Sequence, residues 1–253
     1  MRILVVNPNT TASMTAKVAA AARAVAAPGT EIVAVTSGMG PASIEGYYDE
    51  ALSLPGLLAE IAEGERSGVA GHVIACFDDT GLDAARALAA APVVGIGEAA
   101  FHLASLVAHR FAVVTTLARS IPAIETNLVR YGLAARCAKV RSAEVAVLAL
   151  EEPGSPARDR ISAEIARATR EDRAEAIVLG CAGMADLAAD LAARHGVPVI
   201  DGVAAAVKLI EALAALGVRT SKVGGYAAPL PKPYLGLLAP FAPGTYSRAE
   251  RGS

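Results

Sequence analysis

Two stretches decide the fold of this 253-residue chain: HVIACFDDTGL at residues 72–82 and AIVLGCAGMADL at residues 176–187. Each begins with an apolar run typical of a buried strand, reaches a cysteine (Cys76 or Cys181), and continues into residues that favour turns and helices. In a parallel α/β fold, this junction lies at the carboxyl edge of the sheet, where ligands bind. The pattern therefore predicts two thiols that can approach one small molecule from opposite faces. Such a pair could remove a proton from one side of a carbon and return a proton to the other.

The halves of the chain that hold these stretches also match elsewhere. In the first half, Val5-Val6-Asn7 precedes Cys76 and Pro92-Val93-Val94 follows it. In the second half, Val113-Val114-Thr115 and Pro198-Val199-Ile200 flank Cys181 in the same order and at a nearly constant offset. An alanine-rich helical pattern follows each Pro-Val run. These matches in register predict a duplicated α/β unit.

Short runs rich in Val, Ile and Leu alternate with helical patterns along the whole chain. We expect strands near 2–7, 30–36, 72–76, 93–95, 110–115, 136–141, 175–180 and 197–200, and helices near 11–26, 50–66, 81–90, 97–109, 119–131, 157–173, 183–194 and 202–216. This alternation is typical of parallel sheets covered by helices on both faces. The predicted fold class is α/β, with two pseudo-symmetric lobes, each a mainly parallel sheet flanked by helices, and an active-site cleft between them. We expect the first lobe to comprise residues 1–96 plus 205–253 and the second to comprise residues 97–204.

The composition is that of a globular protein, with 54% hydrophobic and 19% charged residues. A net charge of −2 gives no electrostatic reason to expect nucleic acid or an anionic membrane as a partner. No apolar run approaches the roughly 18 residues of a membrane span, and the chain enters its first strand without a secretory pattern. We therefore expect a cytoplasmic protein without a disulfide framework. The alanine-rich helices are compatible with a homo-oligomer, which we also expect.

Cys76 and Cys181 are the candidate catalytic residues. The alternative is that each is a small buried apolar residue at the end of a strand. The turn residues after Cys76 suggest that Asp79 or Thr80 caps the next helix, whose amino terminus would lower the thiol pKa. Glycines on both sides of Cys181 would let backbone amides approach a ligand. Cys137 has no counterpart in the other half, so we assign it to structure.

Further candidate residues follow the first strand of each half. Asn9 and Thr10 follow one strand, and Thr115 and Thr116 stand at the corresponding edge of the other. These side chains could cap helices, or they could bind the polar atoms of a ring and stabilise an enolate oxygen. Tyr47 lies in a glycine-containing loop that forms either a wall or lid of the pocket or an ordinary surface loop.

The sequence offers no pattern typical of a metal or nucleotide site. The four histidines lack the spacing of metal ligands. No glycine-rich dinucleotide fingerprint or phosphate loop follows the first strand. We therefore expect no metal and no nucleotide cofactor.

Several stretches together resemble one known family: Asn7–Thr11, Ile74–Asp79, Phe111–Arg119, Val178–Met184 and Pro198–Gly202. They are similar to the hydantoin racemases, including the allantoin racemases, of the aspartate/glutamate racemase superfamily, and the likeness covers nearly the whole chain. The resemblance implies two pseudo-symmetric α/β lobes, no cofactor, and paired cysteines as acid and base. By position, these cysteines are Cys76 and Cys181.

One difference from the amino-acid racemases of this superfamily narrows the range of possible substrates. Those proteins have Asn-Thr after the first cysteine and Thr-His after the second, whereas this chain has Phe77-Asp78-Asp79 and Ala182-Gly183. Two acidic side chains would repel a free carboxylate, so a neutral ring with N–H donors and carbonyl acceptors fits better. Thr80 stands where hydantoin and allantoin racemases often have proline.

The resulting hypothesis is a cofactor-independent racemase of 5-monosubstituted hydantoins, in which a thiolate and a thiol exchange a proton at ring carbon C5. Allantoin racemisation is the alternative. A related isomerase of the maleate type, a malonate decarboxylase and a non-enzymatic small-molecule binding protein are further alternatives. The preferred 5-substituent (aromatic, aliphatic or ureido) and the enantiomer on which each cysteine acts stay open at this point.

Overall fold

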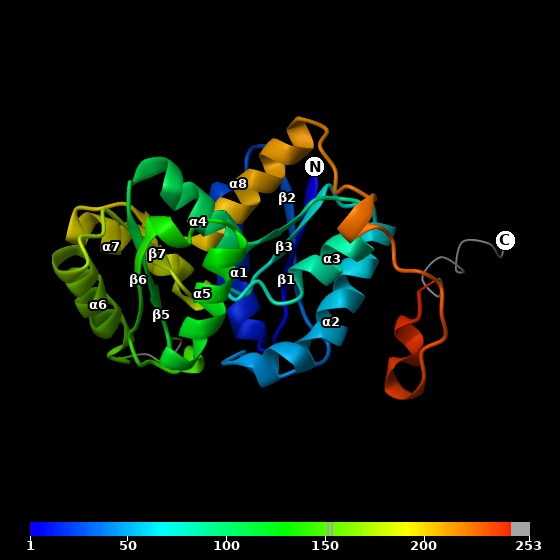
Figure 1. Ribbon diagram of the computed structural model, residues 1–253, viewed down its shortest axis with the longest axis horizontal. Coiled ribbons are helices and arrows are strands. Elements are labelled where there is room, and N and C mark those ends of the chain that lie inside the picture. The colour runs from blue at the N-terminus through cyan, green and yellow to red at the C-terminus, as the bar shows by residue number, and fades with distance from the viewer. Residues whose placement is uncertain (151, 153, 244–253) are drawn as a thin grey trace.

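The computed structural model describes residues 1–150, 152 and 154–243. Two all-parallel, four-stranded sheets form its framework (Figure 1). The first sheet has the order β2-β1-β3-β4 and comprises β1 (Arg2–Asn7), β2 (Glu31–Thr36), β3 (Gly71–Ile74) and β4 (Val93–Gly95). The second has the order β6-β5-β7-β8 and comprises β5 (Phe111–Thr115), β6 (Cys137–Ser142), β7 (Ala176–Leu179) and β8 (Val199–Ile200). The same order and direction in both sheets confirm the predicted α/β fold class with its pseudo-symmetric halves.

Eight α-helices connect and cover these strands in the described residues: α1 (Ala12–Val25), α2 (Tyr47–Arg66), α3 (Leu82–Leu88), α4 (Ile96–Val107), α5 (Ile121–Arg130), α6 (Ala157–Glu171), α7 (Ala188–His195) and α8 (Gly202–Ala215). The strands agree with the sequence prediction to within two residues at each end. Two helix starts differ more. Helix α2 begins at Tyr47 instead of residue 50, and α7 begins at Ala188 because Ala182–Leu187 forms a 3-10 helix, η4.

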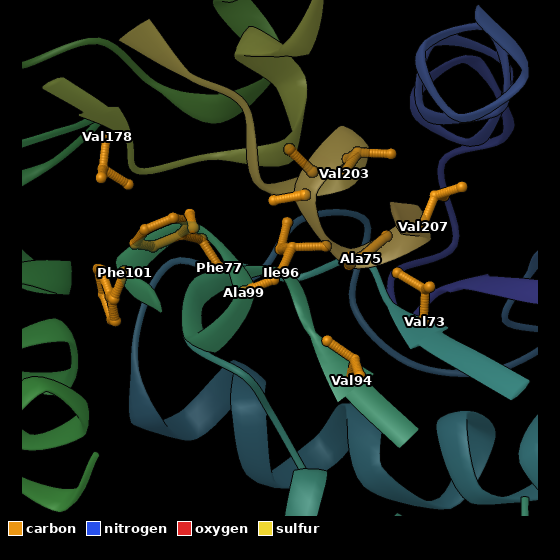
Figure 2. Packing of buried hydrophobic residues seen from close by; sticks show 14 of the residues in the cluster. Val73, Ala75, Phe77, Val94, Ile96, Ala99, Phe101, Val178, Val203 and Val207 are labelled. Atoms are coloured by element: carbon orange, nitrogen blue, oxygen red, sulfur yellow. The ribbon is translucent and has the colours of Figure 1, made fainter. Parts of the chain in front are cut away.

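A single apolar core joins the two sheets. Alternate strand residues, such as Val73 of β3 and Val178 of β7, face this core together with buried side chains of α1, α4 and α8. Figure 2 shows Val73, Ile96, Val178, Val203 and Val207 contributing to it from both halves. The opposite face of each sheet packs against a second layer of helices. Burial on both faces explains why the strands consist of nearly continuous Val, Ile and Leu runs.

The chain from α8 onward packs back onto the first half of the molecule. Helix α8 contacts β3 and β4 as well as α4. Lys222 then donates to carbonyl oxygens at the end of α3, and the Tyr226 hydroxyl donates to Asp83. The lobe boundaries at 96/97 and 204/205 stay a prediction. Residues 247–253, for which the sequence predicts a loose end, lie outside the described residues.

No helix in the part of the chain that the structure describes has the length and apolar character of a membrane span.

Candidate active site

Cys76 and Cys181 line the same recess, which has a volume of about 420 Å³ including its open mouth. The first half of the chain contributes Pro8, Asn9, Ile44, Cys76, Phe77 and Asp78 to its wall. The second half contributes Thr116, Ser120, Val147, Gly180, Cys181 and Ala182. The two halves thus build one site from equivalent positions.

The two cysteines are brought there by equivalent strands. Strand β3 ends at Ile74 and β7 at Leu179, so each cysteine comes two residues after the end of its strand. Both strands pair with the first strand of their sheet. The thiols are therefore held on short connections at the carboxyl edges of two rigid sheets. The predicted position of both cysteines at the carboxyl edges of the sheets is thus observed, except that β3 ends at Ile74 and not at Cys76.

Burial dominates the ionisation of both thiols. It raises the pKa of Cys181 to about 11 and raises the pKa of Cys76 well above its usual range. The negative charge of Asp78 raises both pKa values further. Hydrogen bonds lower the two pKa values by less than burial raises them: the Thr80 hydroxyl donates to Cys76 Sγ over 3.5 Å, and the Gly183 backbone N–H donates to Cys181, where its effect exceeds that of Asp78.

The predicted lowering of the Cys76 pKa by a helix amino terminus is therefore wrong. Helix α3 begins at Leu82 and its N-cap is Gly81, five residues after Cys76. A helix dipole acts mainly within the first turn, so it does not reach the thiol. With their pKa values raised in this way, both cysteines are expected largely as neutral thiols near pH 7.

Asp78 places a titratable carboxyl on the wall of the recess. Burial raises its pKa to about 7, with further contributions from the charges of Glu50 and Asp79. Its ionisation near neutral pH adds negative charge beside both sulfur atoms. An anionic substrate group would be repelled here, whereas an N–H donor would be stabilised.

Asp79 does not line the recess and has a structural position instead. Its carboxylate accepts hydrogen bonds from the backbone N–H groups of Gly97 (2.9 Å) and Glu98 (2.7 Å) and from the Tyr131 hydroxyl (2.8 Å). It therefore caps α4 and not α3, which corrects the expectation of a cap on the next helix. The cap comes from a residue that is distant in sequence, so local spacing could not reveal it.

This assignment predicts a stability effect for Asp79→Ala. Because the substitution leaves two helix N–H groups and the partly buried Tyr131 hydroxyl without their partner, we expect the free energy of unfolding to fall by about 2 kcal/mol. Urea denaturation followed by circular dichroism measures this. The matched variant Asp78→Ala should change stability by no more than about 0.5 kcal/mol. Equal losses in both variants would contradict the capping assignment.

The other predicted binding residues divide into two groups. Asn9 and Thr116 are buried and line the recess. Thr10 is exposed and donates to the Pro41 carbonyl, and Thr115 donates to the Gly180 carbonyl over 3.0 Å. Thr115 thus fastens β5 to the Cys181 connection and does not reach the wall of the recess.

Tyr47 differs most from its predicted position. It is the first residue of α2 and is 61% exposed, so it is neither a wall nor a lid of the recess. Ile44, from the same loop, occupies the wall in its place and is buried. An isolated apolar residue in a polar loop is the sequence signal for this contact.

Residues after the second cysteine also have distinct positions. Ala182 lines the recess, while Gly183 contributes the N–H bond to Cys181 and lies behind the wall. A Cβ atom on Gly183 would lie 2.9 Å from Leu150 Cδ1. Sequence reasoning missed Ser120 and Val147, because no local pattern indicates that their segments reach the recess.

Among the described residues, no three His, Cys, Asp or Glu side chains are grouped so that they could hold a metal ion.

Known proteins are similar to this chain in sequence and architecture. A family model described as Asp/Glu/Hydantoin racemase matches residues 3–210. A hydantoin racemase of Rhizobium meliloti is 52% identical over 229 residues, which cover 90% of this chain and 95% of that protein. A hydantoin racemase of Pseudomonas sp. (strain NS671) is 48% identical over 241 residues, covering 95% and 97%. The solved structure of an allantoin racemase from Klebsiella pneumoniae superposes with a TM-score of 0.94 at 51% identity, covering 96% of this chain and 99% of that chain.

The chain belongs to the Asp/Glu/hydantoin racemase family and is an isomerase of the racemase type.

Proposed function

We propose that the protein racemises 5-monosubstituted hydantoins by proton transfer at C5 between Cys76 and Cys181. The observation that carries this proposal is that both cysteines line one recess from equivalent strands of two sheets. The high identity to two hydantoin racemases supports the substrate class. The neutral ring also suits a site that contains the carboxyl of Asp78.

In this proposal one cysteine, as thiolate, removes the C5 proton and leaves a planar enolate. The thiol of the other cysteine then donates its proton to the opposite face of C5, which inverts the configuration. The first cysteine ends as a thiol and the second as a thiolate, so the enzyme is ready for the reverse reaction. General acid and base steps of this kind each contribute about 10² to 10⁴ in rate.

The enolate oxygen needs hydrogen-bond donors. Asn9 is suited to this role because its Oδ1 atom is already occupied by the Asn7 amide and the Thr11 backbone N–H. Its Nδ2 group makes a contact of 3.5 Å with Met14 Sδ, which is a weak acceptor, and can therefore turn to a ligand. Thr116 also lines the recess and carries a hydroxyl donor. We assign Asn9 and Thr116 to the ring oxygens and Asp78 to a ring N–H.

Allantoin is the second candidate substrate, because it is a hydantoin with a ureido group at C5. Two solved allantoin racemases, at 51% and 45% identity, favour it. The apolar side chains of Ile44 and Val147 on the wall favour an aromatic or aliphatic substituent instead. Since the relatives favour a ureido group and the wall residues favour an apolar group, an experiment has to identify the preferred 5-substituent.

A racemisation assay decides between these substrates. We expect the purified protein to remove the optical rotation of L-5-benzylhydantoin and of an aliphatic 5-substituted hydantoin, without net conversion to another compound. (S)-Allantoin is the comparison substrate, and a higher kcat/KM for it would assign the ureido substituent. The loss of carbon dioxide from a substrate, or no change in rotation with any of the three compounds, would contradict the proposal.

A further inference from the structure

A lysine from the first half of the chain reaches the connection that holds Cys181. Lys17 lies on α1, and its Nζ atom is 3.3 Å from the Gly183 carbonyl oxygen and 3.4 Å from that of Leu150. It is also 3.8 Å from Asp186 Oδ1. An ammonium group has three donors, and here three acceptors surround it. Two of these acceptors belong to Gly183 and Asp186, within the η4 segment that follows Cys181.

The contact joins the two halves at the point where the site is assembled. Helix α1 follows β1 of the first sheet, whereas η4 follows β7 of the second, and the two pack against each other. The Gly183 residue that accepts from Lys17 also donates its N–H to the Cys181 sulfur. By holding Gly183 in place, Lys17 therefore also holds a direct hydrogen-bond partner of the Cys181 thiol. The Lys17 side chain is only 22% exposed, so solvent screens its charge incompletely.

The two thiols consequently have unequal electrostatic surroundings. Asp78 and Glu50 act on Cys76, and both are acidic. Cys181 is also exposed to the field of Asp78, but Lys17 opposes it. Within the described part of the chain, no lysine or arginine is among the main influences on Cys76.

We propose that Lys17 is a positioning residue for Cys181, which holds the η4 segment through the Gly183 and Leu150 carbonyls and favours the thiolate at Cys181 over the thiolate at Cys76. This proposal rests on the proposed function, since it concerns the same pair of thiols. It adds that the pair is asymmetric: the small thiolate fraction of the free enzyme resides mainly on Cys181.

The test measures each thiol directly. Wild type, Lys17→Met and Lys17→Arg are treated with iodoacetamide between pH 7 and 11, and the alkylation rates of Cys76 and Cys181 are read separately by peptide mass spectrometry. In Lys17→Met we expect the midpoint of the pH profile of Cys181 alkylation to move up by about one pH unit. At pH values below that midpoint, the Cys181 alkylation rate should therefore be about tenfold lower than in wild type. The Cys76 profile should not move. Lys17→Arg keeps the charge and should restore most of the wild-type behaviour at Cys181.

The matched control is Lys208→Met, which removes an equal charge from α8, where Lys208 is half exposed and paired with Glu211. It should leave both profiles unchanged. An unchanged Cys181 profile in Lys17→Met, or equal shifts at both cysteines, would overturn the proposal. The alkylation readout does not depend on turnover. If the protein failed to racemise hydantoins while the selective shift at Cys181 persisted, the proposed function would fail and the placement of Lys17 would stand.

Discussion

Replacing either Cys76 or Cys181 by serine should lower the rate of racemisation by about 10³-fold or more. A serine hydroxyl at these positions would not ionise near neutral pH, so the variant would lose one of the two groups to which we assign the exchange of the C5 proton. Each general acid or base step contributes about 10² to 10⁴ in rate, and the two thiols act in series. The loss should appear in kcat more than in KM, because neither sulfur is needed to hold the ring. Polarimetry with L-5-benzylhydantoin measures this.

Cys137→Ser provides the matched control. Cys137 begins β6 and lies beside Lys139 and Val129, away from the recess that holds the other two cysteines. Its substitution should leave racemisation within about twofold of wild type, since a residue outside the site makes no contact with the reacting atoms. Wild-type activity in either Cys76→Ser or Cys181→Ser would contradict the two-base scheme.

The second large effect is a steep dependence of activity on pH. Burial raises the pKa of Cys181 to about 11, so near pH 7 only a small fraction of the free enzyme carries a thiolate. Below that pKa the thiolate fraction increases about tenfold for each pH unit. We therefore expect kcat/KM to rise strongly from pH 7 to 9, after subtraction of the uncatalysed racemisation.

Asp78 modifies the lower part of this profile. Because its pKa is raised to about 7, its carboxyl ionises as the pH passes through neutrality and then opposes thiolate formation. The rise should therefore be shallower between pH 6 and 8 than above it, and Asp78→Asn should remove that inflection. A profile that falls between pH 7 and 9 would contradict the raised thiol pKa.

The framework can be predicted because its signals are local and repeated. Each strand is a Val- and Ile-rich run bounded by helical patterns, and the matching positions of Cys76 and Cys181 are enough to indicate the duplication. The helix starts are predicted less accurately. Helix α7 begins after a 3-10 segment that includes Gly183, and glycine patterns do not distinguish such a turn from an α-helix.

The site can be predicted only where its residues lie within a few positions of a strand end, as Asn9, Asp78 and Thr116 do. The prediction for Asp79 is wrong because its partners, Gly97 and Glu98, belong to a helix distant in sequence. The predicted thiol pKa is wrong because burial is a tertiary property that local motifs do not contain. Self-association and a cytoplasmic location stay predictions from the sequence.

The central claim is that two thiols face the same ring carbon from opposite sides. Hydrogen exchange at C5 in D₂O tests it most directly, with the separate enantiomers of one hydantoin and the variants Cys76→Ser and Cys181→Ser. We predict that each variant exchanges the C5 hydrogen of only one enantiomer, that the two variants have opposite preferences, and that neither inverts configuration. Exchange of both enantiomers by a single variant would contradict the account, because one remaining thiol would then serve both faces of the carbon.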